Sequence, residues 1–149
     1  MWICGKEHRP GRRGQGREDM QRFTIPGRLE GLNEIIKADR GNRYKGAKLK
    51  RDSTAVCAWI IRAAGLQAVR RYPVTICIHW AERDGRRDPD NIASGKKFIL
   101  DGLQVAGILC NDGPKQIRGF VDTFAVDGKA PRVEVAIFED GEAVAGFPE

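Results

Sequence analysis

Two aspartates one residue apart, Asp88 and Asp90, are the residues of this chain best suited to chemistry. Pro89 between them fixes its own φ and favours an extended Asp88, so we expect both carboxylates to be held with little freedom. Two carboxylates this close repel each other unless a cation lies between them. Mg²⁺ would resolve the repulsion, because it takes oxygen ligands from one or two carboxylates and from phosphates. The pair therefore predicts a metal site that handles phosphate, although DPDN taken alone is more often a capped turn.

Basic residues lie on both sides of this pair. Arg86 and Arg87 precede it, and Lys96 and Lys97 follow in the first turns of the predicted helix. Cations near a helix N-terminus are mildly unfavourable, so helix stability does not explain the lysines. We therefore predict that they contact phosphate.

Two aspartates further along the chain could contact residues of the same site. Asp101 is four residues after Lys97, so an ion pair on one helix face is the alternative role for that lysine. Asp112 is in the turn after the helix and is a third candidate metal ligand. The chain would have to double back to bring Asp112 to Asp88 and Asp90.

Charge is distributed unevenly along the chain. The net charge is +6, and residues 1–50 hold 13 Lys and Arg against 6 Asp and Glu, whereas residues 51–149 hold 13 against 14. A basic front half beside a carboxylate cluster favours a polyanion, nucleic acid before membrane, as partner. The predicted phosphate contacts in the basic half are Arg43, Lys45, Lys48 and Lys50.

The chain has 149 residues, which suits one domain, and it has no apolar run long enough to span a membrane. Its four cysteines have apolar neighbours and form no CxxC pair, which predicts buried reduced thiols and a cytoplasmic protein. The cysteines are Cys4, Cys57, Cys77 and Cys110.

Hydrophobic periodicity predicts the order β-α-α-β-α-β-β, an α+β fold in which a mixed sheet of about four strands packs with about three helices. Strands are expected over 21–29 and 74–82, and the last two strands are expected to form an antiparallel hairpin. In the long helix over about 44–64, Val56, Trp59, Ile60 and Ala63 recur at spacings of three and four, which predicts a core-facing stripe.

We expect one domain over 20–140. Residues 1–19 are rich in Gly and Arg, and they are predicted to be disordered or an over-extended reading frame that precedes Met20. A disordered basic arm that contacts DNA is the alternative. Residues 141–149 are predicted to be a loose tail.

The stretch RRDPDN, then KKFILDGLQVAGIL, then ND resembles the RusA-like family of phage and prophage Holliday-junction resolvases. The family pattern is Asp-x-Asp-Asn, a lysine, Asp-x-Leu on the helix and an aspartate after it. The corresponding residues here are Asp88, Asp90, Asn91, Lys97, Asp101, Leu103 and Asp112. Two departures are a longer spacing before the lysine, so that Lys96 and Lys97 compete for its role, and Asn111-Asp112 in place of two aspartates.

The resemblance implies a homodimeric, Mg²⁺-dependent endonuclease, with Mn²⁺ as a substitute, that resolves four-way DNA junctions in recombination and repair. Asp88, Asp90 and Asp112 become the implied metal ligands, and Lys97 the cation that stabilises the phosphate. The implied location is the cytoplasm of a bacterial or phage-infected cell.

Two other functions are compatible with the sequence. A non-catalytic module of the same fold would bind branched DNA, with the aspartates serving as helix caps. A metal enzyme that acts on nucleotides would need a phosphate-binding loop, and the chain has no Gly-rich loop of Walker or dinucleotide type.

Overall fold

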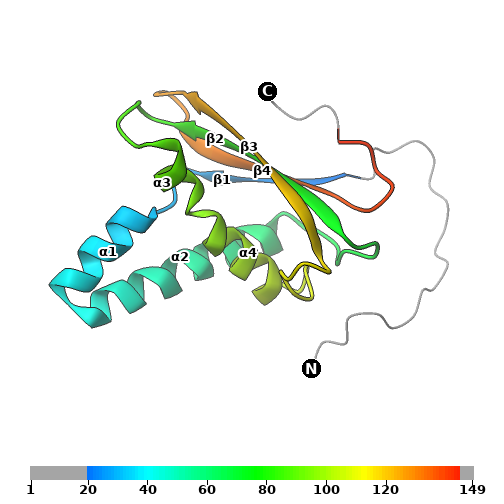
Figure 1. The fold of residues 1–149 in the computed structure, drawn as a ribbon, viewed down its shortest axis with the longest axis horizontal. Coiled ribbons are helices and arrows are strands. Elements are labelled where there is room, and N and C mark those ends of the chain that lie inside the picture. Colours follow the sequence, from blue (N-terminus) through cyan, green and yellow to red (C-terminus); the bar gives the residue numbers. More distant parts are fainter. Residues whose placement is uncertain (1–19, 145–149) are drawn as a thin grey trace.

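The computed structural model describes residues 20–144, so the predictions for residues 1–19 and for the end of the tail lie outside the described residues. Within these residues, four strands and four helices follow one another in the order β-α-α-β-α-α-β-β (Figure 1). They are β1 (Gln21–Pro26), α1 (Leu32–Gly41), α2 (Arg43–Ala63), β2 (Val74–Glu82), α3 (Pro89–Ala93), α4 (Lys96–Val105), β3 (Ile117–Val126) and β4 (Arg132–Phe138).

The strands form one mixed sheet in the order β1-β4-β2-β3, which confirms the predicted α+β class. β2 runs parallel to β3 and antiparallel to β4, and β4 is also antiparallel to β1. The predicted hairpin of the last two strands is wrong, because β2 lies between β3 and β4. As an almost fully buried strand, β2 needs a neighbour on each side to satisfy its backbone.

All four helices lie on one face of the sheet (Figure 1). Their apolar side chains meet Val74, Ile76, Ile78 and Trp80 of β2 in the main core. These are alternate residues of β2, and they point to the same face of the sheet.

The core-facing stripe of α2 is rotated by about one residue from the predicted one. Cys57, Ala58 and Ile61 are buried, whereas Val56 is exposed and the Trp59 side chain is 71% exposed. Small residues face inward because α2 crosses α4 closely. A Cβ placed on Gly102 of α4 would lie 2.7 Å from Cys57 Cβ, so no larger side chain fits at the crossing.

The helix predicted after the aspartates is divided into α3 and α4, which are separated by Ser94 and Gly95. Within residues 20–144, no helix is both long and apolar enough to cross a membrane.

The cysteine prediction is confirmed for two of the described residues. Cys57 and Cys77 are buried free thiols, and burial raises the pKa of Cys57 to about 12. For Cys110 the prediction of a reduced thiol is wrong, because this residue is disulfide-bonded.

Candidate functional site

The two arginines before the aspartate pair have different environments. The Arg87 side chain is only 8% exposed, and its guanidinium contacts both carboxylate oxygens of Glu82, at 2.7 and 3.3 Å. It also donates to the Leu29 carbonyl at 3.1 Å. The Arg86 side chain is 86% exposed. Arg87 is therefore occupied in joining the loop to the end of β2, and of the two predicted phosphate contacts only Arg86 is open to a ligand.

A second carboxylate completes the surroundings of Arg87. Glu34 Oε1 of α1 lies 3.7 Å from the guanidinium, and Glu34 Oε2 accepts from the Gly31 N–H at 2.8 Å. Burial works against ionisation of Glu34, but backbone N–H donors and the Arg87 charge outweigh it, so its pKa lies below the ordinary value. One arginine thus connects β2, the loop and α1.

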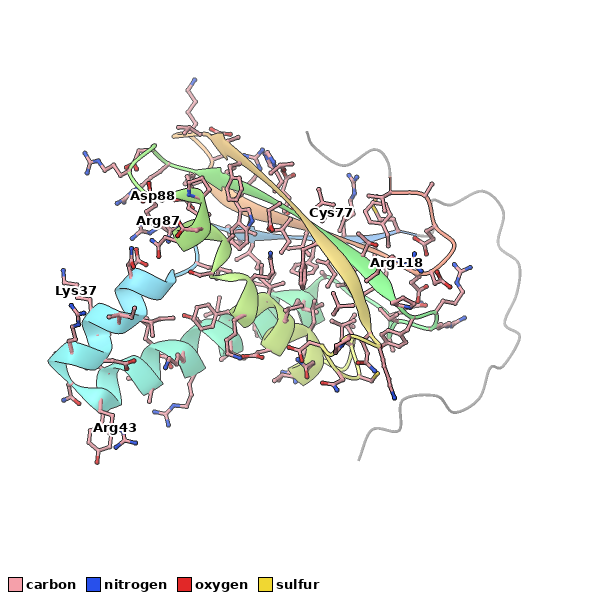
Figure 2. The ribbon with its side chains drawn as sticks, in the orientation of Figure 1. Lys37, Arg43, Cys77, Arg87, Asp88 and Arg118 are labelled. Carbon is pink, nitrogen blue, oxygen red and sulfur yellow. The ribbon has the colours of Figure 1, made fainter. Side chains whose placement is uncertain are left out.

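Asp88 and Asp90 follow this anchor directly, and Asp88 lies beside Arg87 at the start of α3 (Figure 2). Asp88 is the N-cap of α3 with φ −71° and ψ 149°, so its predicted extended backbone is confirmed. Both aspartates are exposed. Within residues 20–144 neither side chain has a hydrogen-bond or ion-pair partner. Two carboxylates are thus presented to solvent on a backbone that the buried side chain of Arg87 holds in place.

Asn91 explains how α3 is held against α1. Its side chain is buried, and its Oδ1 accepts from the backbone N–H of Asn33 at 3.0 Å. Helix α1 begins after Gly31, which has no side chain to act as a cap. Asn91 therefore caps α1 from another element, and a Cβ on Gly31 would lie only 2.6 Å from Asn91 Oδ1.

Asp112 lies at the opposite end of β2 from the other two aspartates. The loop that carries Asp88 starts at the Glu82 end of β2, whereas the loop that carries Asp112 returns to the Val74 end, where Val74 N–H donates to the Gln116 carbonyl at 2.8 Å. The nine residues of β2 extend over roughly 26 Å. Asp112 thus does not join Asp88 and Asp90 within one chain.

Within residues 20–144, no other side chains take the place of the distant Asp112. Among the described residues, no group of three or more His, Cys, Asp or Glu side chains is arranged to hold a metal ion. Asp88 and Asp90 would therefore offer at most two carboxylates from one copy, a number that Mg²⁺ accepts when phosphate and water complete its shell.

The two candidate lysines are also separated by the fold. Lys96 is 18% exposed, its Nζ lies 2.6 Å from Asp122 Oδ2, and it covers the ring of Phe120 at 4.4 Å. Lys97 is 73% exposed and lies 3.4 Å from Asp101, so the predicted i, i+4 pair is present. A surface pair of this kind is weak and opens readily for a stronger anion. Lys97 is therefore the lysine that is open to phosphate.

The four remaining basic candidates lie on the first half of α2. Arg43 and Lys45 have no ion-pair partner within the described range, whereas Lys48 lies 3.2 Å from Asp52 and Lys50 lies 3.7 Å from Asp39. Arg43 lies at the outer turn of the α1–α2 hairpin, at the same end of the long axis as Asp88 (Figure 2). The hairpin thus places positive charge at the end of the molecule that presents the two aspartates.

Sequence reasoning missed the carboxylates that hold the cations, namely Glu34, Glu82 and Asp122. Asp122 accepts from Trp80 Nε1 at 2.9 Å as well as from Lys96. For Glu82 and Asp122, a carboxylate inside a run of strand residues was the available signal, because a charge on a half-buried strand needs a partner.

Comparisons with known proteins give no relative. A scan of the chain against models of protein families finds no match, and a search of curated proteins finds no similar sequence. The likeness to RusA-like resolvases therefore stays a prediction that rests on the motif residues alone.

Proposed function

We propose that this chain is a Mg²⁺-dependent endonuclease of RusA-like type, which acts as a homodimer and hydrolyses phosphodiesters in branched DNA. One observation carries the proposal: Asp88 and Asp90 are exposed and unpartnered within residues 20–144, on a backbone held by the buried Arg87. A plain helix cap would use its carboxylate on backbone N–H groups, and Asp88 makes no such bond.

The two carboxylates fit the hard cation that such a reaction needs. Asp88 and Asp90 would hold Mg²⁺, or Mn²⁺ in its place, through oxygen ligands. When bound, the ion would lower the pKa of a water and clamp the oxygens of the phosphate. The contribution of the protein is position, because Arg87 and Asn91 fix the α3 backbone from which both carboxylates project.

The third predicted ligand, Asp112, enters the proposal through the second copy. Since it lies at the far end of β2 in its own chain, it can meet Asp88 and Asp90 only if the partner supplies it. A dimer would then contain two equivalent sites, each completed by the other subunit. Two sites related by a twofold axis suit a junction in which two strands are cut.

The open cations would bind the substrate. Lys97 would neutralise charge on the phosphate that is attacked. Arg86 and the hairpin residues Arg43, Lys45, Lys48 and Lys50 would contact phosphates of the flanking duplex. These contacts carry no base readout, so we expect selection by DNA shape. Such an enzyme would work in recombination and repair in the cytoplasm of a bacterial or phage-infected cell.

The decisive experiment uses a synthetic four-way junction, incubated with and without Mg²⁺. Wild type is expected to nick it only with the ion, and Asp90→Asn is expected to lose at least about 100-fold in rate while it still binds. The matched control is Asp52→Asn, which makes the same charge change on the exposed face of α2.

Each failure has a distinct meaning. If wild type binds the junction but never nicks it with any divalent ion, the chain is the non-catalytic branched-DNA-binding module. If Asp90→Asn nicks at the wild-type rate, the assignment of the carboxylates is wrong.

A further inference from the structure

The solvent face of α2 carries a regular stripe of exposed side chains. Its six members recur at spacings of four and three, which places them on one face of the helix: Tyr44, Lys48, Arg51, Ala55, Trp59 and Arg62. All six are exposed, and α2 lies along the side of the molecule opposite the sheet (Figure 1). We call these six residues the solvent stripe.

Two aromatic rings stand out in the solvent stripe. Tyr44 is 83% exposed and Trp59 is 71% exposed. Within residues 20–144, neither ring has a hydrogen-bond or stacking partner. The two residues are separated by roughly 22 Å along the helix axis, at a rise of about 1.5 Å per residue. Two ring faces near opposite ends of the stripe are thus open to a ligand.

Positive charge accompanies the rings. Helix α2 holds six Lys and Arg residues and one acid, Asp52, which lies 3.2 Å from Lys48. Arg51, between the rings, has no ion-pair partner in the described part of the chain. Next to Trp59, the Arg62 guanidinium donates to the Val105 carbonyl of α4 at 3.1 Å, which holds the charge in place without neutralising it. The solvent stripe is therefore complementary to a polyanion.

We infer that the solvent stripe binds single-stranded nucleic acid: bases stack on Tyr44 and Trp59, and the phosphates between them meet the cations of the stripe. Single-strand binding sites combine these two features, a positively charged track and rings on which bases stack. A duplex does not suit the rings, because its bases stack on one another and offer only their edges in the grooves. The choice of nucleic acid as the polyanion rests on the proposed function.

An acidic protein is the other partner that this charge would attract. The residues that dominate a protein interface cluster in one well-packed centre. Here the two rings are far apart on the helix, and charged and small side chains lie between them. Rings that alternate with cations match the alternation of bases and phosphates in a single strand, so we favour nucleic acid.

The solvent stripe narrows the substrate class of the proposed nuclease. Lys48 belongs both to the stripe and to the cations proposed for the flanking duplex, so the single strand would begin where that duplex ends. Branched DNA with an unpaired arm would therefore bind more tightly than a four-way junction in which every base is paired.

The test measures binding by fluorescence anisotropy in EDTA, so that cleavage plays no part. The probes are a labelled thymidine oligomer of about 12 nucleotides, within the size range of known single-strand sites, and a duplex of equal length. Tyr44→Leu/Trp59→Leu is expected to weaken single-strand binding at least about 10-fold and to change duplex binding by less than about twofold. The matched control, Tyr44→Phe/Trp59→Phe, keeps both rings and should bind the single strand within about threefold of wild type.

Two further readouts separate stacking from charge. Stacking of thymine on Trp59 should quench part of the tryptophan emission of the wild type, and Trp59→Phe should bind the strand without that quenching. Arg51→Gln should reduce the salt slope of single-strand binding by about 0.7, whereas Lys129→Gln, the same charge change between β3 and β4, should not.

Three results would overturn the inference. One is single-strand binding of wild-type strength in the leucine variant, and another is an equal loss of single-strand and duplex binding. The third is binding of polyglutamate that is lost with the two rings, which would indicate an acidic protein as the partner.

The inference and the proposed nuclease can fail separately. A chain that binds the thymidine oligomer through both rings but never nicks branched DNA keeps the solvent stripe as a binding site and removes the nuclease. A chain that nicks junctions while its leucine variant binds the oligomer like wild type keeps the nuclease and removes the single-strand site.

Discussion

Lys96 and Asp122 form a partly buried ion pair, with Nζ 2.6 Å from Oδ2, that ties α4 to β3. Trp80 Nε1 donates to the other carboxylate oxygen, so three elements meet at one side chain. The adjacent Lys97 is free of such a network and contacts only the partly buried Asp101 within the described range. The two neighbouring lysines thus have different roles: Lys96 is structural, and Lys97 is open to a ligand.

We predict that Lys96→Ala lowers the free energy of unfolding by about 2 kcal/mol or more, because it leaves the Asp122 carboxylate without its charged donor. Lys97→Ala should leave stability within about 0.5 kcal/mol of wild type and reduce junction nicking. Urea denaturation and nicking rates, measured on the same samples, check both. A folded but inactive Lys96 variant beside an active Lys97 variant would reverse the two assignments.

The two arginines before the aspartates should also differ in role, one in stability and the other in DNA binding. Arg87→Ala is expected to cost about 3–5 kcal/mol of stability, because it leaves buried Glu82 unpaired. Arg86→Ala should not alter stability, and it should reduce the salt dependence of DNA binding by about one phosphate contact. Thermal unfolding and binding at several salt concentrations distinguish the two. Equal stability of both variants would contradict the structural role of Arg87.

Mixing two inactive proteins tests whether Asp112 acts across the dimer. Asp88→Asn and Asp112→Asn should each fail to nick a junction. After co-refolding, about a quarter of the sites should be intact, because half of the dimers are mixed and each mixed dimer has one complete site. If both aspartates acted within one chain, mixing would restore nothing, so an inactive mixture shown to contain mixed dimers excludes action in trans.

The crossing of α2 and α4 predicts a stability effect at Gly102. Gly102→Ala should destabilise the fold by about 1–3 kcal/mol, although alanine favours helix, because the new methyl group meets Cys57 Cβ at 2.7 Å. The control is Gly41→Ala in α1, where a Cβ has nothing within 4 Å. Guanidinium denaturation of both variants should show a loss at Gly102 alone.

The buried thiol of Cys57 predicts a loss of stability in alkali. The unfolded thiol ionises near pH 9.0, whereas the raised pKa of the folded thiol keeps it protonated to about pH 12. Between these values the unfolded state releases a proton that the folded state retains, so stability falls as pH rises. The decline in unfolding free energy from pH 8 to pH 11 should be shallower in Cys57→Ala. An identical slope in both proteins would show that Cys57 is not responsible.

Local periodicity was enough to predict the elements that have their own pattern. The alternation of Val74, Ile76, Ile78 and Trp80 marked β2, and the predicted bounds of α2 agree with Arg43–Ala63 to within a residue or so. The apolar stripe of α2 was misplaced because Cys57 and Ala58 are small, and only the approach of Gly102 shows that small residues are needed there. Strand order was missed because neighbours in sequence need not be neighbours in a sheet.

The candidate site was predictable only as far as local geometry reaches. Pro89 and Asp88 gave the extended backbone, and the spacing of Lys97 and Asp101 gave their ion pair. Arg86 and Arg87 look alike in sequence, and their different roles become clear only from the contacts of Arg87 with Glu82 and with the Leu29 carbonyl. The distance of Asp112 from Asp88 and Asp90 depends on the relative directions of β2 and β3, which no local sequence pattern predicts.

The amide of Asn91 has a mechanical consequence. Because it caps α1 from α3, the α1–α2 hairpin and the aspartate pair share one attachment, and in the proposed nuclease a duplex that pulls on the hairpin would also load the backbone next to Asp90. Close packing of Gly31 against Asn91 leaves little room for that attachment to slip. If the proposed substrate binds the hairpin, strain there would reach the backbone that carries the two carboxylates through this one hydrogen bond.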